Sequence, residues 1–154
     1  QAEIAFVEAV RQPVRPIDGA AETLRALKAR GLRLGLISNT MWPGVYHRRD
    51  LARFGLLEPF EALFFSADEA TWKPEPEIFH RALRALDLTP GEAAFVGDSR
   101  LMDVLGAQKV GLRGVWVECH DPWMPQGVQI IPDATIRHLT DLLPVVDAWL
   151  DNQA

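Results

Sequence analysis

The chain has 154 residues and a mass of 17.2 kDa, which suits one domain large enough to form its own core. Hydrophobic residues make up 48% and charged residues 24%, which is typical of a globular protein and excludes a disordered one. Sixteen Lys and Arg residues against 21 Asp and Glu residues give a net charge of −5 and a pI near 5.3. This balance argues against a nucleic-acid-binding protein, because it offers no basic stripe to neutralise phosphates.

Cysteine content and hydropathy indicate the compartment. The single cysteine, Cys119, excludes an internal disulfide, and no cluster of Cys and His residues indicates structural zinc. No apolar run approaches the roughly 18 residues of a membrane span. The first residues, QAEIAFVEAV, also lack the basic head of a signal peptide. The sequence therefore predicts a reduced, cytoplasmic protein without a membrane partner.

The first segment of the chain resembles the end of a helix. Residues Ala2–Gln12 place apolar side chains on one helical stripe, which Pro13 and Pro16 then stop. Because the sequence starts at Gln1 and not at Met, we expect it to be a fragment of a longer protein. We assign residues 1–14 to this leading helix and residues 15–154 to the main domain.

Short apolar runs and amphipathic helical patterns alternate from Pro16 onward. The runs predict strands at Leu32–Ile37, Ala62–Phe65, Ala93–Val96 and Gly114–Val117, buried on both faces. The helical patterns cover Ala21–Arg30, Pro43–Phe54, Glu77–Leu86 and Thr140–Leu150. Units of this size require parallel strands joined by right-handed crossovers. The sequence therefore predicts an α/β fold, a doubly wound, Rossmann-like parallel sheet with helices on both faces.

Polar residues follow three of the predicted strands. Ser38 and Asn39 follow the first, Lys73 lies in the loop after the second, and Asp98 and Asp103 follow the third. Ligands of an open parallel sheet bind at the carboxyl ends of its strands, so we expect these side chains to converge. Hydroxyl, amide and ammonium groups can cradle a phosphoryl group. Two neighbouring carboxylates repel unless a cation lies between them, and Mg²⁺ suits an all-oxygen site.

Each residue also has a purely structural interpretation. Ser38 or Asn39 can cap the next helix, and Lys73 can be a solvated surface charge. Asp98 and Asp103 can simply stabilise the dipole of the following helix. We favour one phosphate-plus-magnesium site because four unrelated roles at one rim are less probable than a single site.

The segments around these residues resemble three motifs of the haloacid dehalogenase-like (HAD) hydrolase superfamily, over essentially the whole chain from Pro16. GLRLGLISNT resembles its second motif, WKPEPEIF its third, and FVGDSRLMDVLGAQKVGL its fourth. The resemblance implies that Ser38 and Asn39 bind phosphate and that Lys73 steadies the nucleophile and the phosphoryl oxygens. It further implies that Asp98 ligates Mg²⁺ and that Asp103 supports the metal site by ligation or hydrogen bonding.

The first motif of this superfamily, DxDxT, is missing from the sequence. Its leading Asp forms an aspartyl-phosphate and its second Asp acts as general acid and base. Asp18 and Thr23 give only a false match to this motif, because no apolar strand precedes them and the second Asp is absent. In the superfamily this first strand lies mid-sheet, between the strands predicted at Leu32–Ile37 and Ala93–Val96. Without it, we expect these two strands either to have unpaired edges or to pair directly with each other. We also expect these residues alone to fold poorly unless another chain or a further segment supplies a strand, and to self-associate through unpaired edges.

The resemblance implies a Mg²⁺-dependent phosphatase of small phosphorylated metabolites, whose nucleophilic Asp lies outside this segment. The segment alone is expected to be inactive and to lack most of the cap domain. The resemblance implies that the leading helix at residues 1–14 is the last piece of that cap and that residues 15–154 are the HAD-like core domain. Asp98 favours a phosphatase over a dehalogenase, since halide-releasing members tend to lack this residue. Two alternatives stay open: a non-catalytic binding or scaffold module, and a 2-haloacid dehalogenase or phosphotransferase.

Two loops carry further aromatic and histidine residues. Met41–His47 follows the second motif and Cys119–Pro125 follows the last predicted strand. Their aromatic side chains line the mouth of a substrate pocket, bind a partner or anchor the loops on the sheet rim, and we favour anchoring. We expect His47 and His120 to be surface residues.

Overall fold

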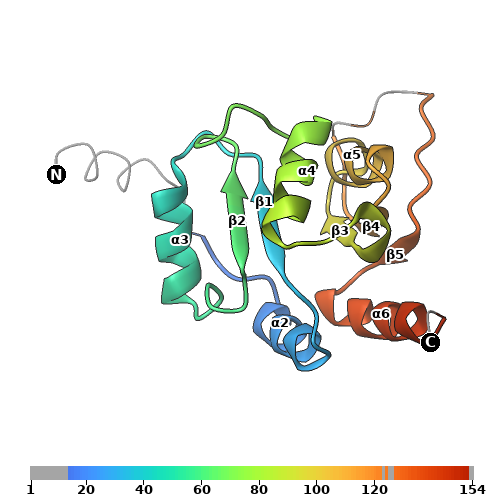
Figure 1. Cartoon of the computed structure of the whole chain (residues 1–154), viewed down its shortest axis with the longest axis horizontal. Helices are drawn as coiled ribbons and strands as arrows, with labels where there is room; N and C mark the ends of the chain where they lie inside the picture. The colour runs from blue at the N-terminus through green and yellow to red at the C-terminus, as the bar shows by residue number, and fades with distance from the viewer. Residues whose placement is uncertain (1–13, 123, 125–126, 153–154) are drawn as a thin grey trace, which may run out of the picture.

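The computed structural model describes residues 14–122, 124 and 127–152 (Figure 1). The predicted leading helix at Ala2–Gln12 lies outside these residues. The helices are α2 (Ala20–Ala29), α3 (Gly44–Arg53), α4 (Pro76–Ala85), α5 (Gly106–Lys109) and α6 (Leu142–Asp151). The strands are β1 (Gly35–Ser38), β2 (Ala62–Phe65), β3 (Ala94–Gly97), β4 (Arg113–Val117) and β5 (Ala134–Ile136). Short 3₁₀ turns occupy Pro90–Glu92 and Leu139–Asp141, and a π-helical turn covers Arg100–Leu105.

All paired strands are parallel, as predicted, but they form two sheets. One sheet pairs β1 with β2, and the other has the order β3-β4-β5. Within the described part of the chain, neither β1 nor β3 has a strand partner on its second edge. The two open edges belong to the strands between which the sequence predicts a missing strand.

Helices cover both faces of the sheets, which confirms the doubly wound α/β class. On one face, Ile78 and Phe79 of α4 are fully buried and pack with Ile37 of β1 and Phe95 of β3. On the other face, Leu27 of α2 belongs to a second core cluster, which joins the β3-β4-β5 sheet to Leu34, the residue that precedes β1. That cluster contains Leu34, Val96, Val115, Ile136, Leu142 and Trp149. Apolar burial on both faces thus bridges the two sheets where no backbone ladder does.

The sequence patterns predict the long elements well and the strand bounds less well. The four predicted helices form, each within about two residues of its expected ends. The first strand begins at Gly35 and not at Leu32, and β5 was not predicted. The strand at Ala134–Ile136 is only three residues long, too short for a periodicity to mark it.

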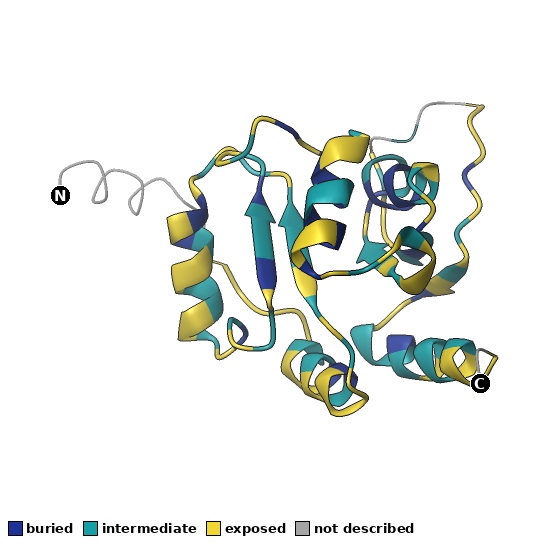
Figure 2. Ribbon diagram, viewed as in Figure 1, coloured by how far each residue is buried: buried dark blue, intermediate teal, exposed yellow. Residues whose placement is uncertain are grey.

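Burial of the strands differs from the prediction. In β1 and β3 the first residue is exposed and the other three are half-buried, whereas β2 begins and ends on a buried residue (Figure 2). The expectation that all strands are buried on both faces is wrong for β1 and β3, the strands with open edges. No helix among the described residues is long and apolar enough to cross a membrane.

Candidate active site

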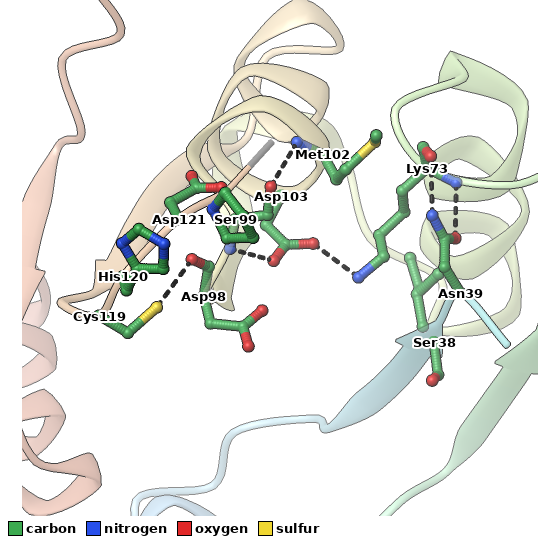
Figure 3. Close-up of a pocket in the computed structure, with 12 residues that line it drawn as sticks. Ser38, Asn39, Lys73, Asp98, Ser99, Met102, Asp103, Cys119, His120 and Asp121 are labelled. Carbon is green, nitrogen blue, oxygen red and sulfur yellow. Dashed lines mark hydrogen bonds and ion pairs between the residues drawn. The ribbon is translucent and has the colours of Figure 1, made fainter. Parts of the chain in front are cut away.

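A cleft of about 620 Å³ opens at the carboxyl ends of β1 and β3 (Figure 3). All five residues singled out in the sequence line it: Ser38, Asn39, Lys73, Asp98 and Asp103. The remaining lining residues are Ile37, Ser99, Met102, Cys119, His120, Asp121 and Pro122. The rule that parallel strands present ligand-binding groups at their carboxyl ends therefore located this cleft correctly.

Asn39 fixes the backbone that carries Lys73. Its Nδ2 donates to the carbonyl oxygen of Lys73 at 2.8 Å, and its Oδ1 accepts from the Lys73 N–H at 2.9 Å (Figure 3). This reciprocal pair joins the loop after β1 to the loop after β2. Ser38, the last residue of β1, lines the same cleft. The amide of Asn39 thus has a positioning role that the sequence did not reveal.

Lys73 and Asp103 form a buried ion pair. The Lys73 Nζ lies 2.6 Å from Asp103 Oδ1, and the two side chains are 11% and 3% exposed. The ammonium also lies 4.9 Å from the ring centroid of Phe95, in the range of a cation–π contact. A buried ammonium needs such partners, because desolvation of an unpaired charge is costly.

The second oxygen of Asp103 is bound by the turn that follows β3. Its Oδ2 accepts the backbone N–H of Ser99 at 2.9 Å, while the Ser99 hydroxyl accepts from the Met102 N–H at 3.2 Å. The closeness of this turn explains the glycine at position 97. A Cβ on Gly97 would lie 2.2 Å from Asp103 Oδ2, so only glycine leaves room for the carboxylate.

Asp98 differs from Asp103 in its surroundings. The residue is exposed, and its carboxylate projects into the cleft without a hydrogen-bonding partner among the described residues (Figure 3). Its backbone carbonyl, in contrast, accepts from Trp116 Nε1 at 3.1 Å and from Cys119 Sγ at 3.3 Å. One carboxylate is therefore fully engaged inside the protein and the other is presented to a ligand.

The donor set fits a hard cation only in part. Mg²⁺ is usually held by one or two carboxylates together with water and substrate phosphate oxygens, and Asp98 is such a carboxylate. Both oxygens of Asp103 have protein partners. The described residues contain no group of three or more His, Cys, Asp and Glu side chains arranged to hold a metal. These residues therefore fit Mg²⁺ through Asp98, with further oxygen ligands coming from elsewhere.

The two loops noted in the sequence behave differently. His47 is half-buried: its ring stacks on Phe65 with 5.0 Å between centroids, and its Nε2 lies 2.8 Å from Thr40 Oγ1. His47 thus anchors its loop, and the expectation of a surface residue is wrong. His120 is exposed as expected, but together with its neighbours Cys119 and Asp121 it lines the cleft. Sequence reasoning favoured anchoring for this second loop because nothing local distinguishes a cleft wall from a rim.

Comparison with known proteins identifies the family. Residues 1–111 match the haloacid dehalogenase-like hydrolase family. Since this match covers more than half of the sequence, the chain belongs to the haloacid dehalogenase-like hydrolases. The resemblance of the three motifs is therefore confirmed at the level of the family.

Several relatives extend this result. The chain is 35% identical over 141 residues to a phosphoserine phosphatase from Thermus thermophilus, covering 92% of this chain and 54% of that protein. A solved HAD phosphatase from Thermococcus onnurineus superposes with a TM-score of 0.72 at 33% identity, covering 86% of this chain and 58% of that one. A solved 2-haloacid dehalogenase from Pseudomonas syringae pv. tomato gives a TM-score of 0.72 at 30% identity, with 88% and 55% covered. The chain spans about half the length of the curated relatives it matches.

Proposed function

We propose that this chain is part of a Mg²⁺-dependent phosphatase that hydrolyses small phosphorylated metabolites through an aspartyl-phosphate. The observation that carries the proposal is that one cleft contains both a lysine held by a buried carboxylate and a second carboxylate that is free to bind a cation. Lys73 is neutralised by Asp103 inside the protein, whereas the carboxylate of Asp98 faces the cleft. The phosphatases among the relatives support hydrolysis of phosphate esters over other reactions of the fold.

Each cleft residue has a distinct task in this proposal. Ser38 and Asn39 donate hydrogen bonds to the phosphoryl oxygens, and the ammonium of Lys73, which gives one N–H to Asp103, donates another to the same oxygens. Asp103 holds Lys73 in place and supports the metal site. Mg²⁺, held by Asp98 and further oxygen ligands, would screen charge on the phosphate when bound. The nucleophilic aspartate comes from a part of the protein outside these 154 residues, so these 154 residues alone are inactive.

The intact mass of the purified natural protein is the first measurement. A mass above 17.2 kDa means that the protein contains a further segment, which is then sequenced for a DxDxT motif. A mass of 17.2 kDa with no phosphate-ester turnover favours a non-catalytic module, and phosphate or Mg²⁺ binding without turnover identifies it. Halide release from a 2-haloacid identifies the dehalogenase instead.

The catalytic test compares Asp98→Asn with Asp87→Asn in the intact protein. We expect Asp98→Asn to lower kcat/KM for p-nitrophenyl phosphate by on the order of 10²–10³-fold, the scale of losing one electrostatic stabiliser. Asp87 is a matched control, because it is exposed, does not line the cleft and has a φ of 49° that Asn also adopts readily. Full activity of Asp98→Asn contradicts the metal assignment.

A further inference from the structure

The backbone at Asp98 is held from the neighbouring strand. Asp98 is the first residue beyond β3, so its carbonyl lies outside the ladder that pairs Ala94–Gly97 with β4. That carbonyl accepts the indole N–H of Trp116 at 3.1 Å and the thiol of Cys119 at 3.3 Å (Figure 3 shows the thiol contact). An indole N–H is a good donor and a thiol a weak one. Trp116 therefore supplies the stronger of the two contacts.

Trp116 is itself held in position. The guanidinium of Arg100 lies 4.5 Å from the centroid of its ring. The backbone N–H of Arg100 donates to Asp121 Oδ2 at 2.7 Å, and Arg100 Nε lies 3.8 Å from the same oxygen. The Asp121 side chain is 1% exposed, so this contact is shielded from water. Segments 98–100 and 116–121 are thus joined by side chains, directly beyond the residue at which the β3–β4 ladder ends.

We propose that Trp116 is a positioning residue for Asp98: its indole N–H fixes the Asp98 backbone so that the carboxylate is presented to the cleft. The proposal rests on the proposed function, in which that carboxylate holds Mg²⁺. The carboxylate makes no hydrogen bond to the described residues, so its place is set by its backbone and its side-chain rotamer alone. Fixing that backbone lowers the entropy lost when a cation is bound.

The test is Trp116→Phe in the intact protein, with Trp149→Phe as its matched control. Phenylalanine keeps an aromatic ring at this position but removes the indole N–H and makes the ring system smaller, and Trp149→Phe makes the same reduction in ring size. Trp149 in α6 carries the same kind of contact, with Arg113 at 4.7 Å from its ring, and does not line the cleft. We expect Trp116→Phe to weaken Mg²⁺ binding about 3- to 10-fold, the scale of one neutral hydrogen bond. Calorimetric titration with MgCl₂ in the absence of substrate measures this, and Trp149→Phe stays within about twofold of the natural protein.

A second readout needs no metal. Hydrogen–deuterium exchange of a peptide covering residues 98–103 is expected to accelerate in metal-free Trp116→Phe and to stay unchanged in Trp149→Phe. Cys119→Ala alone has a small effect, whereas combining it with Trp116→Phe leaves the carbonyl without either donor. The double variant is therefore expected to lose more Mg²⁺ affinity than the two single losses multiplied together.

Two results would overturn the proposal. One is a double variant whose Mg²⁺ affinity and hydrogen exchange equal those of the natural protein. The other is a loss of Mg²⁺ affinity in Trp149→Phe as large as that in Trp116→Phe. Asp98→Asn separates this proposal from the proposed function. If Asp98→Asn keeps its Mg²⁺ affinity, the metal assignment fails, while the exchange experiment still decides whether Trp116 holds the backbone at residues 98–100. If Asp98→Asn loses Mg²⁺ and the double variant keeps both natural Mg²⁺ affinity and natural exchange, the positioning role alone is wrong.

Discussion

The ammonium of Lys73 and the carboxylate of Asp103 lie 2.6 Å apart in the wall of the cleft, nearly excluded from water. Lys73 comes from the loop after β2, and Asp103 from the π-helical turn after β3. The pair therefore connects the two sheets at the point where no backbone ladder does. Folding stability depends on both partners being present, because either one alone would be a buried, uncompensated charge.

Asp103→Asn is expected to destabilise the protein by about 3–5 kcal/mol, because it leaves the Lys73 charge without its partner. Urea unfolding followed by circular dichroism measures the free energy of unfolding. Glu77→Gln is the control, since it breaks exposed ion pairs with Arg81 and Arg84 that water screens. Equal unfolding midpoints for the two variants would show that the buried pair has no special weight.

Gly97→Ala tests the close approach of the same carboxylate to β3. The added Cβ would lie 2.2 Å from Asp103 Oδ2, so Asp103 must move away from the Ser99 N–H. We expect a loss of about 1–3 kcal/mol, the usual cost of overpacking. Gly91→Ala is the matched control, because its Cβ meets nothing within 4 Å. Indistinguishable unfolding midpoints for the two alanine variants would contradict the tight fit at Gly97.

Much of the fold could be predicted because its signals are local. The helix at Pro76–Ala85 has a proline in its first turn and apolar residues at helical spacing, and both are visible in the sequence. β5 could not be predicted, because it is a strand only through its register with β4. The partial burial of β1 was missed for a similar reason: burial depends on what lies beside a strand, and the sequence of the strand does not contain its neighbours.

The candidate site divides in the same way. Strand ends and motif spacing identified Ser38, Lys73 and Asp98 as cleft residues, since the topology alone brings strand ends together. The contacts of Asn39 with the Lys73 backbone and of Trp116 with the Asp98 carbonyl were not predictable. Each joins residues that are far apart in sequence, and each depends on how the segment after one strand lies against another part of the sheet. An Asn or a Trp in a sequence does not by itself predict such a hydrogen bond.

The start of α6 provides a prediction for acid stability. Asp141 accepts the backbone N–H groups of His138 and Arg137 at 2.9 and 3.1 Å. These bonds hold the pKa of the Asp141 carboxyl below its ordinary value of 3.8. A lowered pKa in the folded state means that this stabilisation is present above about pH 4 and is lost as the pH falls through the folded-state pKa.

Asp141→Asn is therefore expected to unfold at a lower temperature than the natural chain at pH 6, and the difference is expected to shrink as the pH falls below the ordinary carboxyl pKa of 3.8. Thermal unfolding at a series of pH values measures the difference. Glu58→Gln removes an exposed loop carboxylate and serves as the control. A difference between Asp141→Asn and the natural chain that does not change with pH would show that the two backbone hydrogen bonds do not depend on the charge.

Among the described residues β1 and β3 each have one open edge, and these edges predict how the 154-residue chain behaves by itself. Unpaired edge N–H and C=O groups are templates for pairing with another chain, and natural edge strands are often protected by charge. No Lys, Arg, Asp or Glu residue lies within Gly35–Ser38 or Ala94–Gly97. We therefore expect this chain to self-associate as its concentration rises.

Sedimentation velocity over a wide range of chain concentration measures this association directly. Ala94→Lys is the informative variant, because Ala94 is exposed and the substitution adds a charge to β3 without burying it. A lysine on an exposed edge disfavours strand pairing, so the variant is expected to stay monomeric at concentrations where the unmodified chain associates. Association that Ala94→Lys does not reduce would place the contact away from β3. If the unmodified chain stays monomeric over the whole concentration range, both edges are protected from pairing.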